Sequence, residues 1–336
     1  MLAERDARVD RTRCCQGERI IRCLVTGAAG FVGANLVHRL IEDGHDVCAI
    51  LQPMTDTGRL DSLTDLRRVQ GDIADRRDME SAFSAARPEW IFHLAAHGAY
   101  SFQTDTVAMA HSNVVGTATL LAAAERHGCA VMINTGTSSE YGDRNHAPRE
   151  DEPPRPNSDY ASTKAAATWL CQRARSRGVP VTTLRLYSAY GPFEEERRLI
   201  PTLVRAALMG TLPPLASPTV VRDFVYVEDV VDAYLAAASS PNMSTIYNVA
   251  SGVQTSLAEL VAKATDTFSL AVGPEWGGYP ERAWDTRVWV GDPALIKSEL
   301  GWAATTTLVE GLTRTAEWLT AHPLESAPAL ATARSA

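Results

Sequence analysis

The chain has 336 residues, which is enough for one large domain or two modest ones with a substantial core. Hydrophobic residues account for 45% of it and charged residues for 21%, as is ordinary for a water-soluble globular protein. The formal net charge of -8 argues against a nucleic-acid partner, and we expect no apolar run long enough to span a membrane.

Both ends of the chain are predicted to be disordered, over residues 1–18 and 326–336. The charged segment from Met1 to Arg13 lacks the apolar centre of an export signal. The six cysteines include no Cys-x-x-Cys pair, which argues against a metal site and indicates a reducing compartment. We therefore expect a cytoplasmic protein without a bound metal.

Strand-like and helix-like segments alternate along residues 19–190. Short apolar strands are predicted at 20–25, 46–51, 67–70, 89–94, 130–134 and 181–187, with helices at 31–40, 78–86, 106–127 and 158–177 between them. This alternation predicts an α/β, Rossmann-like, doubly wound parallel sheet that binds a dinucleotide at the carboxyl ends of its strands.

After residue 190 the pattern loosens into prolines, short strands and scattered helices. The expected helices lie at 199–209, 227–238, 256–267, 293–300 and 308–319. We interpret residues 191–325 mainly as a smaller C-terminal lobe that binds the substrate.

A glycine-rich turn joins the first predicted strand to the first predicted helix. Gly27, Gly30 and Gly33 are spaced G-x-x-G-x-x-G, where glycine permits positive φ and a close approach of backbone to a phosphate. The free N–H groups of Phe31, Val32 and Gly33 at the helix start would then face the anion. The alternative is a glycine-rich turn without a ligand.

A tyrosine and a lysine four residues apart indicate proton transfer. Tyr160 and Lys164 share one face of a predicted helix. A free phenol has a pKa near ~10, and a neighbouring ammonium together with a positive nicotinamide would lower it toward neutrality. Tyr160 would take a proton in oxidation or supply it in reduction, and Lys164 would also bind the nicotinamide ribose. With the glycine turn upstream, this pair predicts hydride transfer at a hydroxyl or ketone carbon.

Several further motifs follow in a characteristic order. They are Gly71-Asp72-Ile73, His93-Leu94-Ala95-Ala96, Asn113, the Tyr160–Lys164 pair and the segment from Arg222 to Asp229. Over roughly residues 20–320 the chain resembles the extended short-chain dehydrogenase/reductases, in the nucleotide-sugar epimerase, dehydratase and ketoreductase group.

The resemblance implies a role for each motif. Asp72 and Ile73 would approach the adenine, while Leu94, Ala95 and Ala96 would pass beneath the cofactor. Asn113 would be both structural and catalytic. Arg222, Arg282 and Ser188, which replaces a common asparagine, would contact the substrate. For His93 and His97 we favour packed polar residues at a strand end over catalysis.

The segment from Asn134 to Gly142 holds the candidates for a catalytic hydroxyl. The family register, counted back four residues from Tyr141, selects Thr137, whereas a shift of one residue selects Ser138, and Ser139 remains a third candidate. The family's dehydratases carry an Asp-Glu pair where this chain has Ser138-Ser139. Elimination and decarboxylation are therefore less favoured, although a one-residue gap could restore Glu140 as an acid.

The residues at the end of the second predicted strand indicate whether the protein prefers NAD(H) or NADP(H). NAD-preferring relatives end it with an aspartate that binds the ribose 2′-hydroxyl, whereas this chain has Leu51, followed by Gln52 and later by Arg59. The missing acid removes repulsion against a 2′-phosphate, which favours NADP(H) over NAD(H).

These observations predict a nucleotide-sugar 4-ketoreductase in which Tyr160 protonates the product. The alternative is a 4-epimerase with a retained NAD, and a third possibility is a non-catalytic dinucleotide-binding protein. The resemblance also implies a homodimer formed through the helices at 106–127 and 158–177, unless their apolar faces pack only within the chain.

Overall fold

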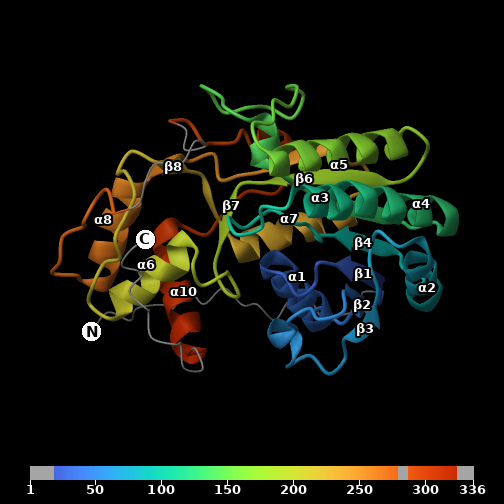
Figure 1. Cartoon of the computed structure of the whole chain (residues 1–336), viewed down its shortest axis with the longest axis horizontal. Coiled ribbons are helices and arrows are strands. Elements are labelled where there is room, and N and C mark those ends of the chain that lie inside the picture. Colours follow the sequence, from blue (N-terminus) through green and yellow to red (C-terminus); the bar gives the residue numbers. More distant parts are fainter. Residues whose placement is uncertain (1–18, 279–286, 324–336) are drawn as a thin grey trace, which may run out of the picture.

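The computed structural model describes residues 19–278 and 287–323. Its centre is a seven-stranded sheet with all strands parallel, in the order β10-β6-β5-β4-β1-β2-β3 (Figure 1). The strands are β1 (Arg22–Thr26), β2 (Asp46–Leu51), β3 (Arg67–Gln70), β4 (Trp90–His93), β5 (Val131–Thr137), β6 (Val181–Leu186) and β10 (Ile246–Val249). The strand order reverses between β1 and β4, where ligands bind in such sheets. The predicted doubly wound parallel fold is confirmed.

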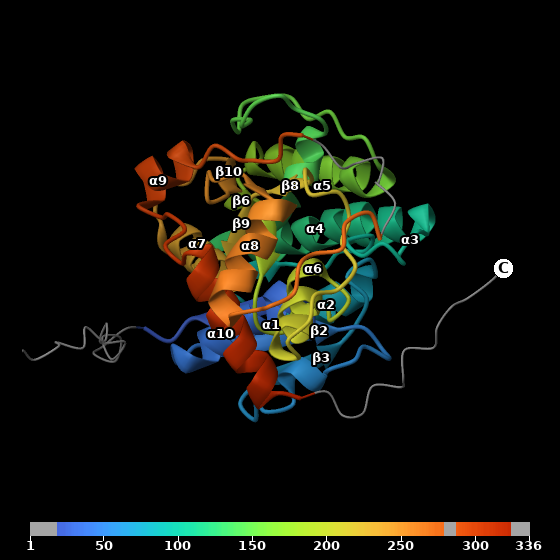
Figure 2. The same ribbon diagram turned by 90° about the vertical axis from the view of Figure 1, so that its left-hand side faces the viewer.

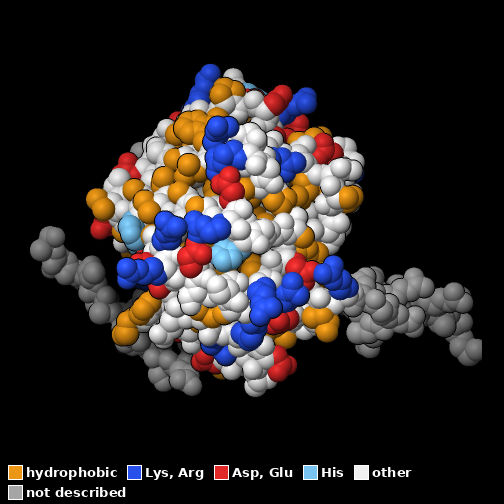
Figure 3. All heavy atoms as spheres, turned by 90° about the vertical axis from the view of Figure 1, so that its right-hand side faces the viewer, with side chains coloured by type: hydrophobic (Ala, Val, Ile, Leu, Met, Phe, Trp, Pro, Cys, Tyr) orange, Lys and Arg blue, Asp and Glu red, His pale blue; other side chains and the backbone are white. Residues whose placement is uncertain are grey.

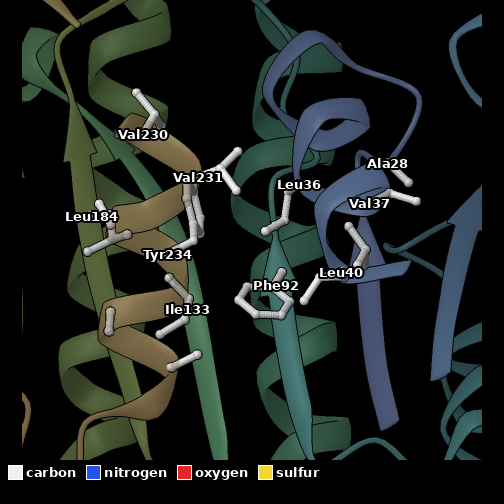
Figure 4. Packing of buried hydrophobic residues seen from close by; sticks show 14 of the residues in the cluster. Ala28, Leu36, Val37, Leu40, Phe92, Ile133, Leu184, Val230, Val231 and Tyr234 are labelled. Atoms are coloured by element: carbon white, nitrogen blue, oxygen red, sulfur yellow. The ribbon is translucent and has the colours of Figure 1, made fainter. Parts of the chain in front are cut away.

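Helices cover both faces of the sheet. One face carries α2 (Arg76–Ala86), α3 (Thr106–Ala110), α4 (Thr117–His127) and α5 (Asp159–Arg175). The other face carries α1 (Phe31–Glu42) and α7 (Val227–Ser239), which pack against each other and against the strands (Figure 4). Side-chain caps begin several of these helices; the Ser158 hydroxyl, for example, accepts a hydrogen bond from the Ala161 N–H at the start of α5.

The strands are buried on both faces because successive side chains point to opposite sides. In β1, Cys23 and Val25 pack toward α1 and α7, whereas Leu24 packs toward α2 and α4. All three side chains are fully buried. This explains why the strands are continuous apolar runs rather than alternating ones.

The second lobe has its own apolar core, formed by α6 (Leu199–Leu208), α8 (Leu257–Phe268) and α10 (Leu308–Ala321) (Figure 2). Two short two-stranded sheets connect it to the first lobe. β7 (Ser188–Tyr190) pairs in parallel with β9 (Phe224–Tyr226), and β8 (Val221–Arg222) pairs antiparallel with β11 (Thr255–Ser256).

The predicted division at residue 190 does not account for two elements that follow it. β10 forms one edge of the central sheet, and α7 covers one of its faces. α9 (Ala294–Leu300) packs beside β10. The chain therefore returns to the first lobe after entering the second.

The predicted helix at 106–127 is interrupted by a π-helical turn, η2 (His111–Gly116). The whole stretch Thr106–His127 is long and apolar enough to pass for a membrane-spanning helix, with a mean hydropathy of 1.3 in its most apolar window, so the expectation of no such run is corrected. This is weak evidence for a membrane, since core helices share the same composition, and 44% of that window is buried inside the protein.

Candidate active site

Two of the three glycines in the glycine turn are required for different steric reasons. Gly27 has φ of 70°, and a Cβ there would lie 2.5 Å from the backbone of Leu94. A Cβ on Gly33 would lie 2.1 Å from the carbonyl oxygen of Gly27, so this glycine lets α1 pack tightly onto the turn. Gly30 is exposed and has φ of -73° at the N-terminal end of α1.

That end of α1 suits the phosphates of a dinucleotide. Among the described residues no side chain caps it, and its first turn contains no acidic residue. The N–H groups of Phe31, Val32 and Gly33 are in the first turn, where an α-helix provides no internal acceptor. The residues present therefore fit a pyrophosphate held by backbone donors and the helix dipole.

A buried histidine links β1 to the helix behind the site. His93 Nδ1 lies 2.8 Å from the Thr26 hydroxyl, and Nε2 lies 2.9 Å from the Thr117 hydroxyl. Because Thr117 gives its only hydrogen to the carbonyl of Asn113 at 2.6 Å, His93 Nε2 must carry a proton and Nδ1 must accept one. Burial, followed by the charge of Lys164, lowers the pKa of His93 to about 3. His93 is a neutral, fully paired core residue, as expected.

Asn113 holds together two segments at the edge of the site. Its side chain pairs with both the N–H and the carbonyl of His97, at 2.8 and 2.9 Å, and donates to the Thr163 hydroxyl at 2.9 Å. The side chain is completely buried within the π-helical turn η2. Such turns are rare and frequently occur at functional sites. Asn113 thus fixes the segment after β4 against α5, and its structural role is visible directly.

The structure brings Tyr160 and Thr137 together. Thr137 is the last residue of β5, Tyr160 lies in the first turn of α5, and their side chains share a hydrogen bond. Ser138 is buried in the following turn, η3 (Ser138–Tyr141), and Ser139 is partly exposed. Of the three candidate hydroxyls, Thr137 is therefore the one that lies next to the phenol of Tyr160.

The phenol of Tyr160 is held in its protonated form. Burial raises its pKa to about 12, while the hydrogen bond to Thr137 and the charge of Arg198 act in the opposite direction. Desolvation of the phenolate is the largest of these effects in the protein without a cofactor. The expected lowering of this pKa by Lys164 together with a positive nicotinamide concerns the cofactor-bound protein and stays a prediction.

Lys164 is 2% exposed and lies one turn after Tyr160 on α5. Burial lowers its pKa, whereas the charge of Glu140 raises it. Its charge also reaches His93. The buried Lys164 is therefore close enough to Glu140, just after β5, and to His93, at the end of β4, for its charge to act on both.

Glu140 is an internal ion-pair partner rather than a substrate-facing acid. Its side chain is completely buried; Oε1 accepts from the Thr137 N–H at 2.9 Å, and Oε2 accepts from Arg185 Nε at 2.9 Å. The guanidinium of Arg185 also stacks 4.4 Å over the ring of Tyr141. Both carboxylate oxygens are used within the protein, so the possibility that Glu140 acts as the missing acid loses its support.

The predicted adenosine side of the site has no carboxylate at the end of β2. Leu51 is buried there, and Gln52 is exposed. Arg59 donates from Nε to the carbonyl of Phe193 at 2.9 Å and from Nη1 to the carbonyl of Ala29 at 3.1 Å. These bonds commit two of its three nitrogens to the backbone, which weakens the case for Arg59 as a 2′-phosphate ligand.

Asp72 and Ile73 follow the end of β3. One carboxylate oxygen of Asp72 accepts from the Ala74 N–H at 2.9 Å, which shapes the turn. Ile73 is buried, and a Cβ on Gly116 would lie 2.6 Å from its side chain. Leu94, Ala95 and Ala96 are partly exposed beyond β4, where a cofactor could lie against them.

Two of the predicted substrate residues, Ser188 and Arg222, lie beyond the carboxyl end of β6. Ser188 lies two residues beyond Leu186, which pairs with Thr137, and its N–H donates to the carbonyl of Asp223 at 2.9 Å. Arg222 therefore lies in the same corner, with its guanidinium 5.4 Å from the ring of Trp289. Arg282 lies outside the described residues.

The charged composition of residues 193–198 suggests a rim of the site whose charges are solvated. One of these charges is not solvated, because the side chain of Glu194 is only 6% exposed. Burial raises the pKa of Glu194 to about 8, against the opposing effect of Arg198. No periodic pattern in a loop reports burial; the only available signal was the Gly191-Pro192 turn that precedes it.

Comparisons with known proteins agree with this geometry. The profile described as the NAD dependent epimerase/dehydratase family matches residues 23–250. A dTDP-glucose 4,6-dehydratase of Streptomyces griseus is 32% identical over 312 residues, covering 89% of this chain and 94% of the relative.

Two solved structures extend the comparison to bound ligands. The UDP-glucose 4-epimerase of Thermotoga maritima with UDP-glucose superposes with a TM-score of 0.81 at 29% identity, covering 89% of this chain and 98% of that one. MoeE5 in complex with UDP-glucuronic acid and NAD superposes with a TM-score of 0.77 at 32% identity, covering 89% of this chain and 99% of that one.

Proposed function

Because the chain belongs to the NAD-dependent epimerase/dehydratase family of nucleotide-sugar enzymes, we propose that it is a 4-ketoreductase of a nucleotide-linked keto-deoxysugar. The observation that carries this proposal is the end of β2, where Leu51 and Gln52 offer no carboxylate to retain a dinucleotide through a catalytic cycle, while Tyr160 and Thr137 lie together as the groups that would protonate a ketone. Reduction of a ketone begins with a protonated donor, whereas oxidation of an alcohol begins with a base.

In this proposal each residue has one task. A bound reduced nicotinamide supplies the hydride. Thr137 and Tyr160 bind the C4 oxygen, and Tyr160 donates its phenolic proton to that oxygen as the hydroxyl forms. Lys164, buried one turn along α5, stabilises the phenolate that remains. The backbone of Phe31, Val32 and Gly33 holds the pyrophosphate.

Elimination of water fits the site less well than reduction. A dehydratase needs a further acid and base beside the tyrosine, and this chain has Ser138 and Ser139 at those positions. Glu140, the nearest acid in the sequence, is paired internally with Arg185.

A 4-epimerase remains the second candidate, because a UDP-glucose 4-epimerase shares the fold at a TM-score of 0.81. The end of β2 favours the reductase over this candidate. An epimerase keeps its NAD through the cycle, whereas a reductase must exchange it, and Leu51 and Gln52 offer no carboxylate to hold the adenosine ribose.

Two observations give no support to the sequence-based preference for NADP(H). The family is described as NAD dependent, and two of the three Arg59 nitrogens already donate to backbone carbonyls and so are not free for a 2′-phosphate. We therefore expect NADH to serve at least as well as NADPH. The test supplies a dTDP-linked 4-keto-6-deoxyglucose with either reduced dinucleotide and follows loss of nicotinamide absorbance. Turnover that needs added reductant supports the reductase, whereas C4 epimerisation of UDP-glucose without added reductant would replace it with the epimerase.

We also propose a homodimer formed through α4 and α5. Val115 and Trp169 are 45% and 54% exposed, and a groove of about 410 Å³ lies between α2, α4 and α5. Apolar side chains alternate with charged ones on the face where α2 and α4 lie (Figure 3). Light scattering on the native protein and on Trp169→Glu tests this: a native protein of monomer mass would argue for packing within one chain only, and a Trp169→Glu variant that stays dimeric would exclude this interface. The free Cys23, Cys48, Cys129 and Cys171 favour a reducing, cytoplasmic setting.

A further inference from the structure

Two segments border the place where a sheet of this kind binds its dinucleotide, which is where the strand order reverses between β1 and β4. On the side of β1 lies the glycine turn, residues 27–33. On the side of β4 lies the segment 94–105, which leads to α3. A contact between a part of the chain fixed to the glycine turn and the segment after β4 therefore spans the dinucleotide site.

The loop 191–198 is fixed at its start to the glycine-turn side. The carbonyl of Pro192 accepts a hydrogen bond from Asn35 Nδ2 on α1 at 2.8 Å, and the carbonyl of Phe193 accepts one from Arg59 Nε at 2.9 Å. Arg59 lies in the short helix η1 (Gly58–Leu60), and its Nη1 also donates to the glycine turn at 3.1 Å. The start of the loop and the glycine turn thus share one set of hydrogen bonds.

Phe193 is held in place although its backbone conformation is unfavourable. Its φ of 67° lies in the left-handed region, where a bulky side chain is rarely found. The ring stacks on His38 of α1 and packs edge-on against Trp318 of α10, each at a centroid distance of 5.1 Å. Strained backbone of this kind persists only where several surrounding contacts impose it. The loop therefore has a firmly anchored start.

The segment after β4 is anchored on the opposite side of the dinucleotide site. Asn113, which pairs with both backbone groups of His97, donates to the Thr163 hydroxyl on α5. At the other end of the segment, the Thr106 hydroxyl donates to the carboxylate of Asp159, the first residue of α5. Both ends of this segment are therefore tied to the helix that carries the proposed proton donor.

Phe102 and Arg197 make a contact between these two anchored parts. The ring of Phe102 stacks on Tyr100 at 5.4 Å, and the guanidinium of Arg197 lies 5.0 Å from the centre of the Phe102 ring, within the range of a cation–π interaction. Phe102 is 57% exposed and the Arg197 side chain is 76% exposed. Because both groups remain largely in water, the contact is weak and opens without disturbing the anchors on either side.

We propose that the Arg197–Phe102 contact is a gate over the dinucleotide site, which sets the rate at which the nicotinamide cofactor enters and leaves. The inference rests on the dinucleotide binding of the proposed function and not on the direction of hydride transfer. A reductase releases its oxidised cofactor after every turnover, so a weak closing contact suits it. An exposed cation–π contact changes the balance between closed and open forms by about two- to fivefold.

Stopped-flow fluorescence provides the test. Protein loaded with NADH is mixed with excess NAD, and the loss of bound NADH fluorescence gives the dissociation rate, while calorimetry with NADH gives the affinity. If the purified protein retains NAD, its release into excess NADH is followed instead. No sugar substrate is present, so the outcome does not depend on which reaction the protein catalyses.

Four single variants separate the contact from its surroundings. Phe102→Leu keeps an apolar side chain but removes the aromatic ring, and Phe102→Trp supplies a ring that binds cations more strongly. Arg197→Gln removes the cation. Glu195→Gln is the matched control, because it removes the ion-pair partner of Arg197 and leaves both members of the gate in place.

Phe102→Leu and Arg197→Gln each speed dissociation of the dinucleotide about two- to fivefold and leave its Kd within about twofold, because the gate slows entry and exit alike. The double variant is no faster than either single one, since both changes remove the same contact. Phe102→Trp slows dissociation, and Glu195→Gln leaves the rate unchanged.

The gate is overturned if either Phe102→Leu or Arg197→Gln releases the dinucleotide at the wild-type rate, or if their effects multiply in the double variant. It is also overturned if affinity falls in step with the rate, or if Phe102→Trp is as fast as Phe102→Leu. A wild type that retains NAD and a Phe102→Leu variant that releases it would support the gate, while replacing the reductase with the epimerase.

Discussion

The buried ion pair between Glu140 and Arg185 allows a quantitative test of how the site is supported. The side chains are 0% and 1% exposed and are joined at 2.9 Å. Glu140→Ala removes the carboxylate that faces Arg185 Nε and also the acceptor of the Thr137 N–H. The substitution therefore leaves a buried positive charge and a backbone donor unpaired beside Thr137, the proposed catalytic hydroxyl.

The expected cost follows from these two losses. Removing one partner of a buried ion pair costs about 3–5 kcal/mol, and an unpaired buried N–H adds about 1–3 kcal/mol before relaxation. Together these costs reach about 4–8 kcal/mol, and relaxation of the Thr137 turn lowers the upper limit, so we expect the free energy of unfolding to fall by about 4–6 kcal/mol. This is a large share of the about 5–15 kcal/mol typical of a native protein.

Urea denaturation followed by far-ultraviolet circular dichroism measures this loss. The matched control replaces both partners, as Glu140→Leu with Arg185→Met, and leaves no buried charge. We expect this pair to cost no more than about 1–3 kcal/mol, because apolar residues of similar volume often replace a buried ion pair without loss and only the Thr137 N–H is left unpaired. A single Glu140→Ala that costs less than about 1 kcal/mol, or a double variant as unstable as the single one, would refute the reasoning.

Three further predictions concern the same site. Tyr160→Phe lowers kcat by at least about 100-fold in steady-state assays and leaves dinucleotide affinity unchanged, since it removes only the proton donor; a smaller effect would exclude Tyr160 as the acid. The folded His93 has a pKa of about 3, below its unfolded value of ~6.5. The free energy of unfolding that this histidine contributes is therefore fully present above pH ~6.5 and is lost as the pH falls, by about 2 kcal/mol at pH 5. His93→Gln removes this part of the acid dependence, and an unchanged slope in urea titrations would contradict it. Gly33→Ala places a Cβ 2.1 Å from the carbonyl oxygen of Gly27, so thermal-shift assays should show lower stability and no protection by NADH. Gly44→Ala is the control for a loss of stability caused by positive φ alone, because no heavy atom lies within 4 Å of its Cβ.

The order of strands, helices and motifs was readable from the sequence alone. Continuous apolar runs bounded by turns report strands that are buried on both faces, and their alternation with helices implies a parallel sheet. The carboxyl ends of such strands meet at one edge, which is why Gly27, Leu94 and Thr137 could be predicted to share one site before any coordinates. The family was accessible for the same reason, because its motifs lie at these strand ends.

Other features depended on which residues meet across long separations in the chain. Glu140 reads as a possible acid until the pairing of β5 with β6 places it against Arg185. β10 lies far beyond the first lobe in sequence but completes its sheet, because the edge left by β6 needed a hydrogen-bonding partner.

Burial of polar groups was likewise decided by the tertiary structure. Glu194 lies in a loop whose composition suggests solvation, and only the anchoring of that loop to Arg59 and Asn35 removes its carboxyl group from water. The high pKa of Tyr160 arises in the same way, since desolvation depends on everything packed around the phenol. The sequence by itself therefore determined the fold and the proposal of which groups react. Their protonation states and partners were set by packing, because local patterns carry no information about the dielectric surroundings of a side chain.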